Sequence, residues 1–331
     1  MTKHPRMIAA IALVTLTAVT LTGCLVTQKE QGPLYERKTD NLRIYKQGDW
    51  IRYNVFATTA NGDFSSGTLE IRWGNYSPLT SPDTNANNNG NPYDVIEKRY
   101  LFCLNDTDGT PCTPQVVAIQ YVHQDDSTTD TSSDPATDGT EWLVAVGNHP
   151  TAGQYYWLNT TGGSTATPDN PDNPYNNPDD SVVGGQEPVI TLKSPLSIGQ
   201  SYSVEYDLMD DCVSGNASCG SDIGHFSNTI EVVGDGTPIN TNIDNYANPF
   251  RVNFAGDVFP DADVDGQLPV TLDIFDLCSN GISNHSGYMY IVPEIGVIQL
   301  RNTCADLSGT GDSIRYDITI DSISPSIRSG S

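Results

Sequence analysis

The sequence predicts an all-β protein made of two tandem antiparallel domains. Each domain is expected to be a curved sheet of half-barrel or sandwich-like form with long polar loops. Three observations support this fold class. Apolar and polar residues alternate with a period of two in four separate segments. Residues that favour helices are scarce, whereas Asn, Asp, Thr, Ser and Gly are abundant. Six cysteines occur as three close pairs, an arrangement typical of disulfide-stapled loops.

The N-terminus has the features of an export signal. Lys3 and Arg6 precede an apolar stretch, residues 7–21, which is too short and too rich in threonine for a membrane-spanning helix. The segment Leu21-Thr22-Gly23-Cys24 closes this stretch. It resembles the lipobox of bacterial lipoproteins, in which the Cys is acylated and the leader is removed before it. The alternative is an ordinary secretory leader with an incidental cysteine.

The lipobox resemblance implies a mature chain of 308 residues that starts at Cys24 and carries a covalent lipid there. Removing Lys3 and Arg6 from 16 basic residues leaves 14 against 41 acidic residues, a formal charge of −27. Such a chain is repelled by nucleic acid and by anionic lipid, so the acyl chains must provide the membrane attachment. Leu25 follows the cysteine. In lipoproteins of the enterobacterial type, the absence of Asp at that position implies transport to the outer membrane.

The predicted strands have one buried and one solvated face, as in antiparallel sheets. They lie at 51–55, 69–73, 202–208 and 314–320. Three polar segments, 77–92, 124–140 and 160–187, contain too little apolar surface to offset the entropy of ordering them. The predicted order is therefore a signal peptide (1–23), a tether (24–41), β domain 1 (42–159), a linker (160–187) and β domain 2 (188–325).

Four segments of the first half resemble four of the second half in the same order. This pattern favours a tandem repeat of one design. The alternative is that unrelated strands share turn chemistry. The matched pairs are 48–53 with 199–204, 62–71 with 224–232, 91–95 with 248–252, and 142–147 with 290–296.

The cysteine spacing predicts three local disulfides, because export favours oxidation and no C-x-x-C motif is present. A metal site is the alternative. The predicted bridges are Cys103–Cys112, Cys212–Cys219 and Cys278–Cys304.

The segment from Asp261 to Gly266 reads D-x-D-x-D-G. Carboxylates at alternate positions of a tight loop suit Ca²⁺, so Asp261, Asp263 and Asp265 are the predicted metal ligands. Leu272 stands where an EF-hand loop needs Glu, so a looser calcium site that pins a loop is expected. The alternative is a solvated acidic turn.

The segment from Tyr288 to Ile298 resembles a stretch that recurs in uncharacterised bacterial lipoproteins. There an aromatic residue, a Pro and a Gly-Val-Gly-like turn join two strands of a curved sheet, and those proteins are similar to open half-barrel carriers of lipoprotein transport. Glu294 stands where the family usually has Gly. The resemblance implies a fold and no activity.

No catalytic motif is present, and the histidines at 123, 149, 225 and 285 have no zinc-site spacing. A triad that includes His225 or His285 is the alternative to surface or strand roles. The aromatic cluster Tyr155-Tyr156-Trp157 suits core packing or ligand stacking. The predicted function is a non-enzymatic binding or structural role at the bacterial outer membrane, on its periplasmic or surface face, with an envelope protein or glycan as partner. The alternatives are an envelope hydrolase and a carrier of an apolar ligand.

Overall fold

The structure is a computed structural model. It describes residues 34–80, 92–105, 111–128, 138–147, 155–159, 189–210, 221–260, 283–306 and 313–329. The described residues belong to one compact unit. No helix among them is long and apolar enough to cross a membrane.

The described secondary structure is almost entirely β, which confirms the all-β prediction. The strands are β1 (Trp50–Thr59), β2 (Phe64–Leu79), β3 (Tyr93–Leu104), β4 (Gln115–Gln124), β5 (Glu141–Val146), β6 (Tyr156–Asn159), β7 (Val189–Leu192), β8 (Ser201–Asp210), β9 (Ser221–Asp235), β10 (Ile239–Asn240), β11 (Asn245–Tyr246), β12 (Phe250–Pro260), β13 (Ser283–Val292), β14 (Gly296–Asp306) and β15 (Ser313–Ile323), and one short helix, α1 (Pro325–Ser329), follows.

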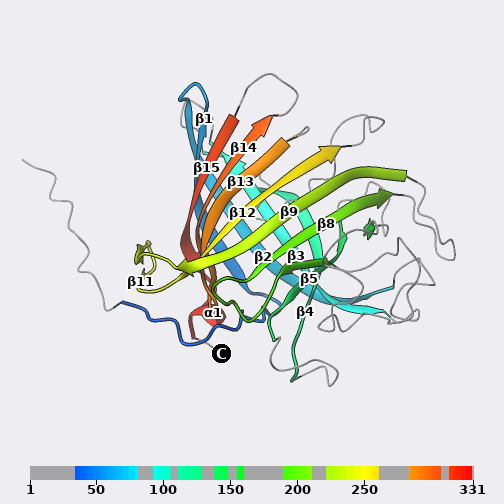
Figure 1. The fold of residues 1–331 in the computed structure, drawn as a ribbon, viewed down its shortest axis with the longest axis horizontal. Coiled ribbons are helices and arrows are strands. Elements are labelled where there is room, and N and C mark those ends of the chain that lie inside the picture. The colour runs from blue at the N-terminus through cyan, green and yellow to red at the C-terminus, as the bar shows by residue number, and fades with distance from the viewer. Residues whose placement is uncertain are drawn as a thin grey trace, which may run out of the picture. The chain divides into compact units, whose positions relative to one another are not determined.

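Twelve of these strands close into an antiparallel barrel. The hydrogen-bonded order runs β4-β3-β2-β1-β15-β14-β13-β12-β9-β8-β6-β5, and β5 pairs with β4 to complete the ring. We call the end of the barrel at α1 the base and the opposite end the rim. Figure 1 shows the strands from β15 to β8 fanning out from the base. The pairing is short at the seam of the ring, because β5 pairs with β4 only at Gln120–Gln124 and β6 pairs with β8 only at Asp207–Met209.

The structure differs from the predicted pair of separate domains. Strand β1 pairs with β15, and β6 pairs with β8, so residues 42–159 and 188–325 contribute to one barrel. Each segment supplies six consecutive ring strands, which alone would form a sheet with two open edges. The larger of two clusters of buried apolar side chains in the described residues contains residues from both segments.

The alternating patterns place apolar residues inside and polar residues outside. In β1, Ile51, Tyr53 and Val55 are buried in the core, whereas Arg52 faces out. All four alternating segments of the sequence lie within strands, namely β1, β2, β8 and β15.

The two six-stranded halves also share a local hydrogen-bond pattern at their first strand pair. The amide of Gly48 donates to the Trp73 carbonyl, and the amide of Gly199 donates to the Val232 carbonyl, both at 2.8 Å. Three of the four matched sequence segments fall on corresponding strands. The fourth match pairs β5 with β13, which occupy different places in the strand order of their halves.

Candidate functional site

The base of the barrel is closed by the segment that enters it, residues 34–49, which we call the strap. The Tyr35 amide donates to Asn245 O at 2.6 Å, and the Arg43 amide donates to Pro293 O at 2.8 Å. The Tyr45 amide donates to Gln124 Oε1 at 3.0 Å. The sequence predicts a tether at residues 24–41. This prediction is wrong for residues 34–41, because they are bound to the barrel. Their contacts are made mostly by backbone groups, so the polar side chains of this segment do not indicate them.

Two glycines allow the strap to lie close against the barrel. Gly296 has φ +112°, and a Cβ there would lie 2.2 Å from the Tyr45 hydroxyl. Gly139 has φ +88°, and a Cβ there would lie 2.0 Å from Leu42 O. Only glycine combines this backbone conformation with this clearance. The Tyr45 hydroxyl donates to Ile295 O at 3.0 Å, so the turn between β13 and β14 receives the strap.

Behind the strap, Tyr45 stacks on Trp73 of β2, with ring centroids 3.8 Å apart and planes 12° from parallel. Burial raises the pKa of the Tyr45 hydroxyl, and the nearby Lys98 opposes that rise. The hydroxyl therefore stays protonated and keeps its bond to the turn. The indole Nε1 of Trp73 is buried, and no hydrogen-bond partner for it lies in the described part of the chain.

A buried ion pair lies beside this stack. Lys98 Nζ of β3 contacts Glu141 Oε1 of β5 at 2.8 Å, and both side chains are about nine-tenths buried. The Thr191 hydroxyl of β7 donates to the same carboxylate oxygen at 3.0 Å. Each charge compensates the other in an apolar interior, so loss of either one leaves an unpaired buried charge.

The strap, the stack and the ion pair enclose a cavity of about 60 Å³. That volume holds roughly four water molecules. A drug-sized ligand or an acyl chain needs a pocket of about 300–1,000 Å³. This cavity therefore does not favour the apolar-carrier alternative.

A larger groove of about 580 Å³ lies on the outer side of the strap. Leu42 and Arg43 line both the groove and the cavity, so the strap forms the wall between them. The other polar groups of the groove come from the β13–β14 turn, the β10–β11 hairpin, α1 and, in the case of Asp138, the segment before β5. The charged side chains of its lining are Lys38, Arg43, Asp138, Asp244, Glu294 and Arg328.

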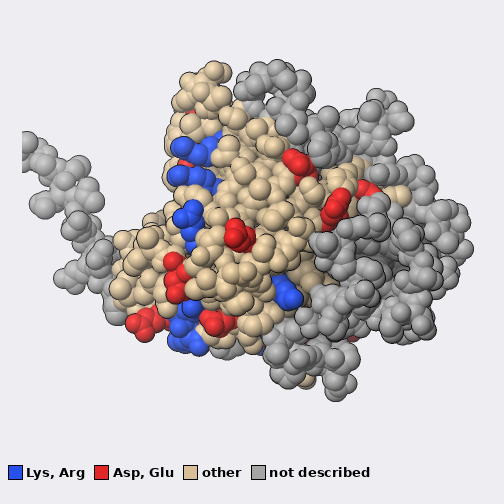
Figure 2. Space-filling view, in the orientation of Figure 1, with Lys and Arg blue, Asp and Glu red and all other residues tan. Residues whose placement is uncertain are grey.

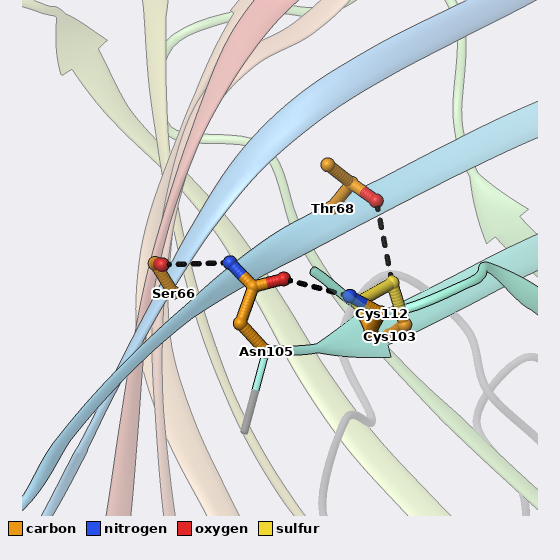
Figure 3. Close-up of a disulfide and its surroundings, with 5 residues drawn as sticks. All are labelled: Ser66, Thr68, Cys103, Asn105 and Cys112. Atoms are coloured by element: carbon orange, nitrogen blue, oxygen red, sulfur yellow. Dashed lines mark hydrogen bonds between the residues drawn. A yellow bond between two sulfur atoms is a disulfide. The ribbon is translucent and has the colours of Figure 1, made fainter. Parts of the chain in front are cut away.

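The first predicted disulfide is confirmed. Cys103 and Cys112 are bonded, with their Cα atoms 5.9 Å apart. Figure 3 shows that Asn105 lies beside the bridge, where its Nδ2 donates to Ser66 Oγ at 3.1 Å and its Oδ1 accepts from the Cys112 amide at 3.1 Å. Asn105 thus ties the crosslinked segment to β2.

The remaining predicted site residues lie mostly outside the described part. Cys304 of β14 is disulfide-bonded, and its predicted partner Cys278 is outside the described residues. Also outside the described residues are Cys24, Cys212, Cys219 and the predicted calcium ligands Asp261, Asp263 and Asp265. Among the described residues, no group of three or more His, Cys, Asp or Glu side chains is placed to hold a metal.

The two histidines named as triad candidates, His225 and His285, lie beside carboxylates and aromatic rings respectively. His225 Nδ1 lies 2.7 Å from Asp207 Oδ1, and its Nε2 lies 3.5 Å from Glu205 Oε1. Each ring nitrogen therefore lies beside a carboxylate. His285 is buried beside the rings of Phe226 and Phe254.

The predicted aromatic cluster packs into the protein. Tyr156 and Trp157 are both buried, and Tyr155 makes an edge contact with Tyr121 at a centroid distance of 4.9 Å. This arrangement is core packing rather than an open stacking platform.

The described strands thus form a closed antiparallel β-barrel, and the strap lies across its base. Comparison of the chain with family models, with curated proteins and with solved structures finds no match. We therefore infer the function from the residues of this chain alone.

Proposed function

We propose that the chain is a lipid-anchored protein of the bacterial outer membrane that acts by binding an envelope component rather than by catalysis. The observation that carries the proposal is the strap. The segment that follows the lipobox-like Cys24 is bound to the base of the barrel from residue 35 onward. About ten residues separate the two, and at roughly 3.5 Å per residue they span at most about 35 Å. An acyl group on Cys24 would keep the base near the lipid and direct the rim away from it.

The rim is the surface that this arrangement offers to a partner. It carries the described strand ends of β3, β8, β12 and β14, where the predicted disulfides and the predicted calcium loop begin or end. Crosslinks and a pinned loop lower the entropy cost of presenting a loop surface to a partner. An envelope protein or a glycan is the proposed partner class. The printed contacts of His225 and His285 give the hydrolase alternative no support within the described residues.

Anchoring is tested with Cys24→Ser in the native host. The unchanged protein should fractionate with the outer membrane and carry fatty acyl chains on its N-terminal peptide by mass spectrometry. Cys24→Ser should be released from membranes. Leu25→Asp is the matched control, because it keeps the acylated cysteine and changes only the sorting residue. An intact leader or an unmodified thiol on Cys24 would contradict the proposal.

Binding is tested with the Cys24→Ser chain, so that acyl chains do not contribute. This chain should co-sediment saturably with envelopes isolated from cells that lack the protein, and it should release no soluble glycan or peptide from them. Absence of saturable binding contradicts the binding role. Release of new reducing ends or peptides supports the hydrolase alternative instead.

We also propose a calcium ion at Asp261, Asp263 and Asp265. A bound ion stabilises the folded state by RT ln(1 + [L]/Kd), so the melting temperature should rise with calcium and fall with chelator. Asp263→Asn should remove this response without changing the melting temperature in chelator. An unchanged melting temperature in calcium would refute the site.

Finally, we propose that the two halves derive from one repeated design. The three matched segments on corresponding strands and the equivalent bonds of Gly48 and Gly199 support this interpretation. A chain built from two copies of the 188–325 half should then form a barrel of the same strand order. Aggregation of that chain under conditions where the natural chain is soluble would count against the repeat.

A further inference from the structure

Two exposed aromatic rings contact each other on the outer wall of the barrel, at the rim end of β1 and β2. Phe56 is 41% exposed and Phe64 is 60% exposed, and their ring centroids lie 5.7 Å apart with planes 22° from parallel. The rings share one face because Thr58, two residues after Phe56, pairs directly with Phe64. The described residues contain no other pair of exposed aromatic rings in contact.

Strands β14 and β15 place hydrogen-bonding groups beside these rings. Asp317 pairs directly with Phe56 on one side and with Arg301 on the other. Arg301 Nε donates to Asp317 Oδ1 at 2.5 Å, and Arg315 Nε donates to Oδ2 at 3.1 Å. Neither guanidinium makes another hydrogen bond to a described residue, so their terminal nitrogens remain available as donors. We call Phe56, Phe64, Arg301, Arg315 and Asp317 the wall patch.

The charges at the wall patch nearly cancel. Its two guanidinium groups exceed the Asp317 carboxylate by one positive charge, which the exposed Asp63 in the β1–β2 turn offsets. On the β12 side, the exposed Arg251 and Glu231 are also opposite in sign. Figure 2 shows basic side chains on the left of the view, where β1 and β15 lie, and a largely uncharged surface above them at the hairpin tip. The chain as a whole carries −25 and repels anionic polymers, so an uncharged partner fits this surface best.

The apolar part of the wall patch is small. An aromatic ring buries about 150–250 Å², so two rings that are about half exposed offer about 200 Å² to a partner. A stable protein interface buries about 800 Å² on each side. The other exposed large apolar side chains lie on other parts of the barrel, namely Leu34, Tyr76, Val116, Ile198 and Val233. A sugar ring needs less area, because it packs one apolar face and hydrogen-bonds through its hydroxyl groups.

We propose that the wall patch binds an uncharged polysaccharide of the envelope. Its sugar rings pack on Phe56 and Phe64, and its hydroxyl groups accept hydrogen bonds from Arg301 and Arg315. The row from Arg301 through Asp317 to Phe56 and β2 crosses four strands and is about 14 Å long, so it can contact more than one sugar ring. This inference rests on the proposed binding role and selects the glycan from its two partner classes.

The first test asks which component of isolated envelopes holds the protein. Washed envelopes from cells that lack the protein are treated with periodate, which cleaves the vicinal diols of sugars, or with protease, and the full-length Cys24→Ser chain is then co-sedimented with them. Periodate should abolish saturable binding, and protease should leave it intact. The neutral polysaccharide fraction of the same envelopes should compete for the protein, whereas the acidic fraction, separated by anion exchange, should not.

The second test locates the site by substitution. The double variant Phe56→Thr with Phe64→Thr keeps residues that favour strands, and it should bind envelopes at least about tenfold more weakly with an unchanged urea midpoint. The double variant Arg301→Gln with Arg315→Gln should also bind more weakly. Tyr76→Thr is the matched control, because Tyr76 is a 58% exposed aromatic residue nearer the base of β2, and it should bind normally.

The outcomes separate this inference from the proposed function. If the unchanged patch gives no saturable binding to untreated envelopes, the binding role itself fails. If binding is present but is lost with protease, survives periodate, is competed by the acidic fraction, or is normal in the Phe56 and Phe64 double variant, the wall patch is not a glycan site and the binding role stands.

Discussion

His285 is predicted to make the stability of the barrel depend on pH. The side chain is 1% exposed on β13, and neither ring nitrogen has a hydrogen-bond partner among the residues that the structure describes. Burial lowers its pKa from 6.5 to about 4, and the charge of Asp257 only partly opposes this. The folded protein therefore holds His285 neutral at pH values where the unfolded chain is protonated there.

The sign and size of the effect follow from this pKa difference. Because the unfolded chain binds the extra proton first, stability is lost as the pH falls from about 6.5 towards 4 and is constant above and below that window. Linkage gives a loss of about 1.4 kcal/mol at pH 5.5 and about 2.6 kcal/mol at pH 4.5, relative to neutral pH. A change of this size is a large fraction of the stability of a typical domain.

The assay is urea denaturation of the wild-type protein and of His285→Gln at pH 7.5, 5.5 and 4.5. Carboxylates titrate in both proteins, so the difference between the two free energies of unfolding isolates the histidine. We expect His285→Gln to be the less stable protein at pH 7.5, because it places an amide in an apolar site, and to lose less stability on acidification. His285→Phe provides an apolar comparison with the same expected pH response. A wild-type-minus-variant difference that stays constant across the three pH values would refute the reasoning.

Three further predictions concern the base and the rim. Lys98→Met should lower the free energy of unfolding by about 3–5 kcal/mol in urea denaturation, because it leaves Glu141 as an unpaired buried charge. The double variant Lys98→Met with Glu141→Leu should recover most of that loss. If the losses of the two single variants simply add in the double variant, the two charges do not compensate each other. Gly296→Ala should cost about 1–3 kcal/mol and make the strap more sensitive to limited proteolysis, and unchanged cleavage would show that the glycine is not needed for strap docking. The double variant Cys103→Ser with Cys112→Ser removes the disulfide and should lower the free energy of unfolding by about 2–3 kcal/mol. An unchanged urea midpoint would contradict this value.

The sequence predicts the strands well because alternation reports directly which face of a strand is buried. Ile51, Tyr53 and Val55 identify the inner face of β1 without any tertiary information. Alternation does not report which strand lies at an open sheet edge. The pairing of β1 with β15 joins residues such as Tyr53 and Ile320, which are far apart in the chain, so closure of one barrel in place of two domains was not predictable.

The base shows a different limit. Lys98 is in phase with the inward residues Ile96 and Tyr100, and a lysine in such a position is a signal for a buried charge. Its partner Glu141 lies 43 residues away and has no spacing that connects it to Lys98. The strap carries still less signal, because its hydrogen bonds are made mostly by backbone groups, which any sequence supplies.

Glu294 connects the sequence argument with the site. Glu294 stands where the resembling stretch of other bacterial lipoproteins usually has Gly. A Gly there would bring no side chain to the base. In this chain its carboxylate accepts the Lys38 amide of the strap, and its second oxygen is buried with no hydrogen-bond partner among the described residues. The same side chain thus fixes the entering segment to the turn between β13 and β14.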